Sequence, residues 1–179
     1  MYSKSGKQVK SFPSNLPGGN RNQSRGKDKY TILDCVFSES NSIFYILDMM
    51  CWDGFTYYNC DTEFRLSWIQ SKFIENKDLR TRSRINPYSF QPLPVYQCTK
   101  ESIGEALNSP MPFSDNLDGL LIYHREVRGI SCEAMCLVIN VDVEENMNEN
   151  NSMNFAYRFN TCLVRLLWLA GSKATWCRS

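Results

Sequence analysis

The side chains that could do chemistry in this 179-residue chain are few and scattered. His124 is the only histidine, and it follows an apolar run, so it is either a general base or a hydrogen-bonded residue at the rim of a core. Asp34, Asp48 and Asp118 lie on or beside predicted strands, where carboxylates can hold a divalent metal, but no pattern places them on one face. Nucleophile elbows, Walker loops and dinucleotide-binding glycine motifs are absent from the sequence. We therefore predict no catalytic residue, no metal site and no cofactor.

The eight cysteines do not form a metal-binding pattern. A structural zinc site needs two closely spaced pairs, and only Cys132 and Cys136 approach that spacing. The first residues are polar and basic, without the apolar core of a secretory signal. We therefore expect reduced thiols, several of them acting as small apolar side chains.

Charge and hydropathy argue against two classes of partner. The chain has 20 basic and 19 acidic residues, whereas a protein that binds duplex DNA nonspecifically normally carries a strong basic excess. The longest apolar stretch, residues 162–171, has about half of the roughly twenty residues that a membrane span requires. We expect a globular protein that binds neither DNA nor a membrane.

Local patterns predict a mixture of strands and helices. Two β-rich runs, residues 30–37 and 43–52, are separated by five small polar residues and predict a hairpin. Apolar spacing predicts a helix over residues 61–73, and a second, short helix capped by Thr99. Residues 117–124 read as a turn and a further strand. Because these elements show no βαβ regularity, we predict an α+β fold with mainly antiparallel sheets and a few helices.

The two ends of the chain differ from its middle. The first thirty residues are polar and basic, which predicts a solvated segment or a loop that meets phosphate. Residues 141–154 are rich in Glu and Asn and predict a loop, and the apolar spacing in residues 155–170 predicts a helix. We expect one domain over residues 1–128 and a divergent tail over residues 129–179.

Short motifs in the first 125 residues form a specific series. They are Tyr2-Ser3-Lys4-Ser5-Gly6, Leu16-Pro17-Gly18-Gly19-Asn20-Arg21, Tyr30-Thr31-Ile32-Leu33-Asp34-Cys35, Met50-Cys51-Trp52, Phe64-Arg65 with Trp68, and Asp118-Gly119-Leu120-Leu121 with Tyr123-His124. Their order and nearly gapless spacing resemble the snurportin family, the nuclear-import adaptors that bind the 2,2,7-trimethylguanosine (m3G) cap of spliceosomal U snRNAs. The resemblance covers about 70% of the chain.

This resemblance implies a fold similar to the nucleotide-binding domain of RNA guanylyltransferases, without their chemistry. Those enzymes carry a Leu-Asp-Gly-Glu block whose glutamate serves the metal, and a nucleophile motif Lys-x-Asp-Gly. The corresponding runs here are Leu33-Asp34-Cys35-Val36 and Lys4-Ser5-Gly6, which lack that glutamate and that aspartate. We expect a non-enzymatic binder. The alternatives are a guanylyltransferase-like RNA-capping enzyme and a protein-interaction remnant without cap affinity.

The resemblance also implies the binding site. An m3G cap joins a positively charged base to a negative triphosphate bridge, so it needs an aromatic face and cations. Lys4 matches the family lysine that contacts the cap. The family places further cap contacts after the helix tryptophan, in residues 69–89 of this chain. Five cations lie in that segment: Lys72, Lys77, Arg80, Arg82 and Arg84.

The implied partners are m3G-capped U snRNA or snRNP, importin-β and the exportin recycling receptor. The resemblance also implies that the protein shuttles between nucleus and cytoplasm.

This sequence departs from the family at both ends. It has no counterpart of the importin-β-binding segment, of the upstream cap-contacting motifs, or of the Gly-Trp whose indole stacks on the cap base. After His124 the chain instead continues through Arg128-Gly129-Ile130-Ser131-Cys132. We therefore expect weak cap affinity and low solubility.

Overall fold

The computed structural model divides into two compact units, each with its own sheet. The first unit comprises residues 1–60, 64–93 and 171–179, and the second comprises residues 61–63 and 94–170. Neither helix in the described part of the chain is long and apolar enough to cross a membrane. The structure describes residues 1–3, 5–20, 29–109, 119–126, 135–140, 162–167 and 175–178.

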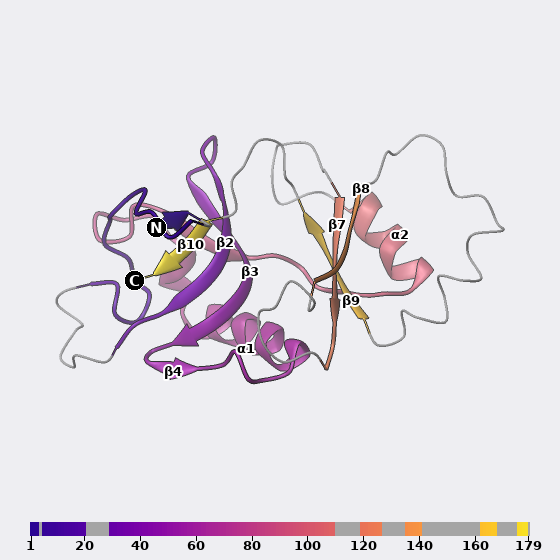
Figure 1. Cartoon of the computed structure of the whole chain (residues 1–179). Coiled ribbons are helices and arrows are strands. Elements are labelled where there is room, and N and C mark those ends of the chain that lie inside the picture. The colour runs from indigo at the N-terminus through magenta and orange to yellow at the C-terminus, as the bar shows by residue number, and fades with distance from the viewer. Residues whose placement is uncertain are drawn as a thin grey trace. The chain divides into compact units, whose positions relative to one another are not determined.

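The first unit is built on a six-stranded sheet (Figure 1). Neighbouring strands run antiparallel, except for one short strand that pairs parallel with the long central strand. The order is β1 (Tyr2–Ser3), β10 (Thr175–Arg178), β2 (Ile32–Ser38), β3 (Ile43–Trp52) and β4 (Phe55–Thr56), and β5 (Ser89–Pro92) is the parallel partner of β3.

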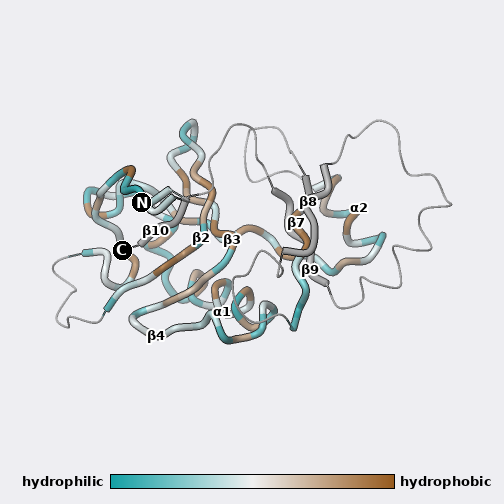
Figure 2. The backbone as a smooth tube through the Cα atoms, in the orientation of Figure 1, coloured by the Kyte–Doolittle hydropathy of each residue, from teal (hydrophilic) through white to brown (hydrophobic). Residues whose placement is uncertain are grey.

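The β2–β3 hairpin forms the core of this sheet and confirms the hairpin predicted from the sequence. Pairing runs from Ile32 opposite Cys51 to Ser38 opposite Ile43. Most side chains of β3 are buried, which explains why its sequence shows no alternation of polar and apolar residues. Hydrophobic stretches in both strands are visible in Figure 2.

Helix α1 (Thr62–Glu75) confirms the first predicted helix. Leu66, Ile69 and Phe73 recur at helical intervals and are buried, so they form the face that packs into the core. The helix ends at Glu75, and the next residue, Asn76, donates from both its backbone N–H and its side-chain amide to the carbonyl oxygen of Lys72. A short 3₁₀ turn, η1 (Lys77–Arg80), follows it.

A charged residue also lies on the buried face of α1. Arg65 is fully buried, and its guanidinium binds both carboxylate oxygens of Asp48 on β3, with Nε–Oδ1 at 2.9 Å and Nη2–Oδ2 at 2.8 Å. Nη1 donates to the carbonyl oxygen of Cys60, and Oδ1 of Asp48 also accepts from the N–H of Met49. The pair therefore has hydrogen-bond partners on both sides, as a buried ion pair requires.

The second unit holds a four-stranded antiparallel sheet and helix α2 (Lys100–Asn108). The strand order is β6 (Tyr96–Gln97), β9 (Cys162–Leu167), β7 (Gly119–His124) and β8 (Met135–Asn140). The Thr99 hydroxyl accepts from the N–H of Ser102 at 3.2 Å, which confirms the predicted cap. The two sheets and two helices make this an α+β fold, as predicted.

The helix predicted over residues 155–170 is wrong for residues 162–167, which form β9. This strand pairs with β7 from His124 opposite Cys162 to Gly119 opposite Leu167, and with β6 on its other side. A short apolar run fits a buried strand and a helix equally well by spacing, so the neighbouring strands decided the outcome.

The predicted loop over residues 141–154 lies outside the described residues. Residues beyond 128 contribute β8 and β9 to one sheet and β10 to the other.

We predict that Arg65→Met lowers the free energy of unfolding by about 3–5 kcal/mol, because it leaves the Asp48 carboxylate buried without its partner. Urea unfolding followed by circular dichroism measures the change. Glu63→Gln is the control, since it breaks an exposed ion pair to Arg125 at 3.2 Å that contributes less than about 1 kcal/mol. Equal losses in the two variants would contradict the prediction.

Candidate functional site

The segment expected to carry the site, residues 69–89, spans the end of α1, η1, a loop and the start of β5. One side chain holds the loop together. Asn86 is fully buried, and its amide nitrogen lies within 3.4 Å of the carbonyl oxygens of Asp78, Leu79 and Thr81. Its Oδ1 accepts from the N–H of Asn15 at 3.2 Å. This connects the loop to a segment more than sixty residues earlier in the chain.

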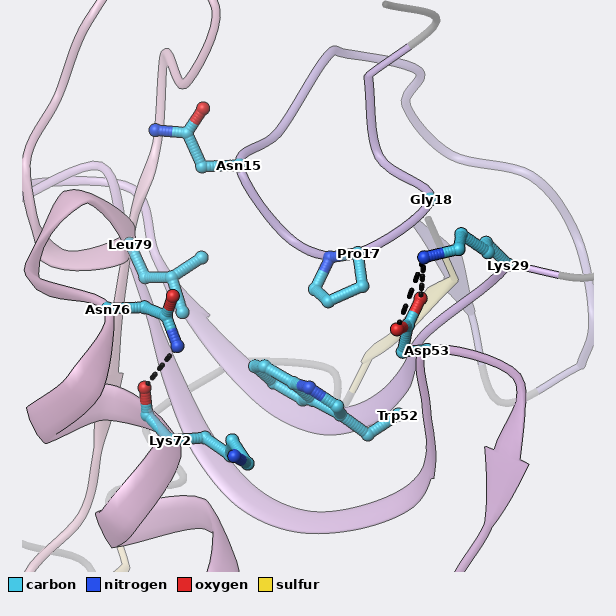
Figure 3. A pocket seen from close by; sticks show the side chains of 9 residues that line it. All are labelled: Asn15, Pro17, Gly18, Lys29, Trp52, Asp53, Lys72, Asn76 and Leu79. Carbon is cyan, nitrogen blue, oxygen red and sulfur yellow. Dashed lines mark hydrogen bonds and ion pairs between the residues drawn. The ribbon is translucent and has the colours of Figure 1, made fainter. Parts of the chain in front are cut away.

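A pocket of about 380 Å³ opens where these two segments meet the end of β3 (Figure 3). It lies entirely within the first unit. Three parts of the chain line it together with Lys29. These lining residues are Asn15, Pro17 and Gly18; Trp52 and Asp53; and Lys72, Asn76 and Leu79.

Trp52 provides the aromatic surface of the pocket. The side chain is only 6% exposed, and it meets Phe73 edge-on with ring centroids 6.1 Å apart. Figure 3 shows its indole between Lys72 and Asp53. Because packing covers and fixes most of this ring, only a small, ordered part of it faces the pocket.

Lys72 lies beside Trp52 at the end of α1. Its Nζ is 2.7 Å from Glu75 Oε2 and 4.6 Å from the ring centroid of Trp68. The ion pair and the cation–π contact together restrict where the ammonium group can lie. The predicted strip of cations therefore contributes one lysine to the pocket.

Lys29 supplies a second cation on the opposite side of Trp52. Its Nζ lies 3.4 Å from Asp53 Oδ1, and the two side chains are 50% and 34% exposed. Asp53 has a φ of 52°, which Asp tolerates better than most residues, and Gly54 follows with a φ of 86°. An ion pair this exposed contributes little to stability, so an anionic ligand can compete for Lys29 at small cost.

The Pro17-Gly18-Gly19 turn forms a wall of the pocket. Gly18 has a φ of 84°, and a Cβ there would lie 2.8 Å from the carbonyl carbon of Lys29. The carbonyl oxygen of Pro17 accepts from the hydroxyl of Thr31 at 2.9 Å. The turn lies in the polar, basic first thirty residues, for which the sequence predicted a solvated segment or a loop that meets phosphate. The structure shows that it contributes to a pocket by crossing closely over the chain at Lys29.

The four other predicted cations that the structure describes do not line this pocket. Lys4 lies outside the described residues. Lys77, Arg80, Arg82 and Arg84 are exposed, and within the described part of the chain none of them forms an ion pair. Arg82 donates from Nε to the carbonyl oxygen of Pro87 at 3.1 Å. Exposed cations of this kind are free to meet phosphate.

Sequence reasoning missed Lys29, Trp52, Asn15 and Asn76 as pocket residues. Trp52 was noted only within a family motif, and Lys29 only as one of several basic residues near the start. No spacing rule connects the two, because the β2–β3 pairing and the turn at Asp53 bring them together.

His124, considered as a general base, and Asp48, considered for a metal, both have local roles in the structure. His124 Nδ1 accepts from the N–H of Glu126 at 3.3 Å, within the turn after β7. Asp48 is bound by Arg65, and Asp118 lies outside the described residues. Among the residues that the structure describes, no three Cys, His, Asp or Glu side chains are grouped to hold a metal ion.

Together these features define an α+β protein with a pocket that combines an aromatic ring with two lysines. The chain matches the family model of the Snurportin1 m3G cap-binding domain over residues 1–159. Because this match covers most of its 179 residues, the chain belongs to that family. Membership supports binding of m3G-capped RNA, and the family is one of non-enzymatic binders.

We predict that Gly18→Ala costs at least about 1 kcal/mol of unfolding free energy more than Gly6→Ala. Both glycines have positive φ, but a Cβ at Gly6 meets nothing within 4 Å, whereas one at Gly18 meets the backbone at Lys29. Gly6→Ala is therefore a control for backbone strain alone. Urea unfolding measures the free energy of unfolding of both variants. Equal losses would show that the closeness of Gly18 to the Lys29 backbone does not limit the residue at this position.

Proposed function

We propose that this chain binds the 2,2,7-trimethylguanosine cap of U snRNAs and acts as an adaptor for importin-β-dependent nuclear import of U snRNPs. The observation that carries the proposal is the family match over residues 1–159. We infer the rest from the resemblance to snurportins. This covers the adaptor role, the import and export receptors as partners, and shuttling between nucleus and cytoplasm.

The physical support comes from the needs of the ligand. The phosphates of a capped RNA require fixed cations, and the cationic base requires an aromatic surface. In the described residues these two groups meet at Lys72 and Trp52. A volume of about 380 Å³ is within the range of small-molecule pockets. We therefore propose Lys72 as the phosphate contact in the pocket. Further contacts would come from Lys4 and from the exposed cations Lys77, Arg80, Arg82 and Arg84.

We expect an m3G-capped dinucleotide to quench the intrinsic tryptophan fluorescence more strongly than its 7-monomethyl counterpart at equal concentration. A methylated base next to an indole changes that emission, and the additional methyl groups add contact area. Equal quenching by the two dinucleotides, or none by either, would overturn the proposal.

Lys72→Ala is expected to weaken binding of the m3G-capped dinucleotide by about tenfold, because a charge-assisted contact to phosphate is lost. Lys100→Ala on α2 is the matched control, since Lys100 is exposed and does not line the pocket. Titrations at two salt concentrations should show a shallower salt dependence for Lys72→Ala only. An unchanged affinity in Lys72→Ala would remove this residue from the site.

The capping-enzyme alternative is tested with labelled GTP and a divalent cation. We expect no covalent adduct, because the nucleophile motif lacks its aspartate and the glutamate of the metal-binding block is replaced by Val36. A labelled protein band that disappears in Lys4→Ala would favour the enzyme instead.

The adaptor role needs a separate measurement. In permeabilised cells supplied with importin-β, the adaptor role predicts that adding the chain increases nuclear accumulation of labelled m3G-capped RNA, through a surface other than the importin-β-binding segment that this sequence does not match. Cap binding without any increase would limit the function to recognition of capped RNA.

A further inference from the structure

Three aromatic side chains on the first unit form a cluster outside the core, which we call the aromatic platform: Tyr57, Phe64 and Trp68. The ring centroids are 5.5 Å apart for Tyr57–Trp68, 5.9 Å for Phe64–Trp68 and 6.3 Å for Tyr57–Phe64. The planes of each pair lie within 31° of one another. Because all three distances are similar, the rings form a triangle and not a single column, so they offer a broad aromatic surface.

The platform is not required by the packing of α1. That helix already buries Leu66, Ile69 and Phe73 in the core, and Phe64 on another face is 47% exposed. Two rings in the segment after β3, Phe55 and Tyr58, are also exposed, and Tyr58 is the chain neighbour of Tyr57. An apolar group with this much exposure in so few residues is typical of a surface that binds something.

Lys72 links the platform to the pocket. Its Nζ lies 4.6 Å from the ring centroid of Trp68, and the same side chain lines the pocket beside Trp52 (Figure 3). A ligand that meets Lys72 in the pocket can therefore continue onto the platform. Aromatic rings beside a lysine are the combination with which proteins bind single-stranded nucleic acid, since bases stack and phosphates meet the cation.

Neither the phenol of Tyr57 nor the two acids of α1 present an unpaired negative charge to an RNA chain. Burial raises the pKa of Tyr57 above its ordinary value of 10.0, so its phenol stays uncharged at neutral pH. The two acidic residues of α1 are both in ion pairs, Glu63 with Arg125 and Glu75 with Lys72.

We propose that the aromatic platform binds unpaired nucleotides of the RNA that follows the cap, by stacking of their bases on Phe64 and its neighbours. This inference rests on the proposed cap-binding function and extends its ligand from the cap to the first stretch of the RNA chain. Lys72 then contacts the phosphates at the point where the pocket and the platform meet.

The test compares an m3G-capped dinucleotide, an m3G-capped deca-adenylate and an uncapped deca-adenylate. We expect the wild-type chain to bind the capped deca-adenylate about tenfold more tightly than the dinucleotide, a gain of the size that stacking of one base provides. Phe64→Ala should remove this advantage and leave the affinity for the dinucleotide unchanged.

Two matched variants isolate the stacking. Phe64→Leu keeps an apolar side chain but lacks a ring, so it should behave like Phe64→Ala. Ile74→Ala removes an apolar side chain that is 67% exposed on the same helix and does not belong to the platform, so it should behave like the wild type. Circular dichroism melting establishes that all variants are folded.

The outcomes separate this inference from the function on which it rests. If the dinucleotide binds and the longer RNA gains nothing, or Phe64→Ala keeps the gain, the platform does not bind RNA and a protein partner becomes its candidate occupant. If capped and uncapped deca-adenylates bind equally and Phe64→Ala weakens both, the platform is supported while cap recognition fails. If no RNA binds, both proposals fail.

Discussion

The buried ion pair between Asp48 and Arg65 sets the geometry on which the rest of the first unit depends. Asp48 is on β3, which ends at Trp52, and Arg65 is on α1, which carries Lys72 two turns further along. Two hydrogen bonds join the planar guanidinium of Arg65 to the planar carboxylate of Asp48. They fix how far α1 lies from β3 and which face of α1 is turned toward it. Because a lone charge in this interior would be very unfavourable, the pair favours one arrangement of these elements over the alternatives.

That arrangement places the pocket next to the aromatic platform. Phe64, Trp68 and Lys72 recur at intervals of four residues on one face of α1, so the lysine that lines the pocket with Trp52 and Lys29 also adjoins the platform rings. The family assignment supports capped RNA as the ligand. A capped RNA end has a charged base, a phosphate bridge and a following chain of nucleotides, so a site with cations between two aromatic surfaces suits its chemistry.

Local sequence signals predicted the elements with strong local causes. The β-rich runs gave the β2–β3 hairpin, helical spacing gave α1, and the Thr99 cap gave α2. The same reasoning was wrong for residues 162–167, which form a strand because β7 and β6 satisfy its backbone hydrogen bonds on both edges. The sequence of a short apolar run does not show whether its backbone hydrogen bonds form within a helix or with neighbouring strands.

By itself, the sequence determined the α+β class and the family resemblance, and it identified Lys72 within a strip of cations. These conclusions need only residues that lie close together in the sequence, because caps, turns and motifs are formed by neighbours in the chain. The tertiary structure alone decided that Lys29, Trp52 and Lys72 share one pocket, and that a glycine turn near the start forms its wall. The reason is that strand pairing, the Asn86 hydrogen bonds and the Asp48–Arg65 pair join residues that no local pattern relates.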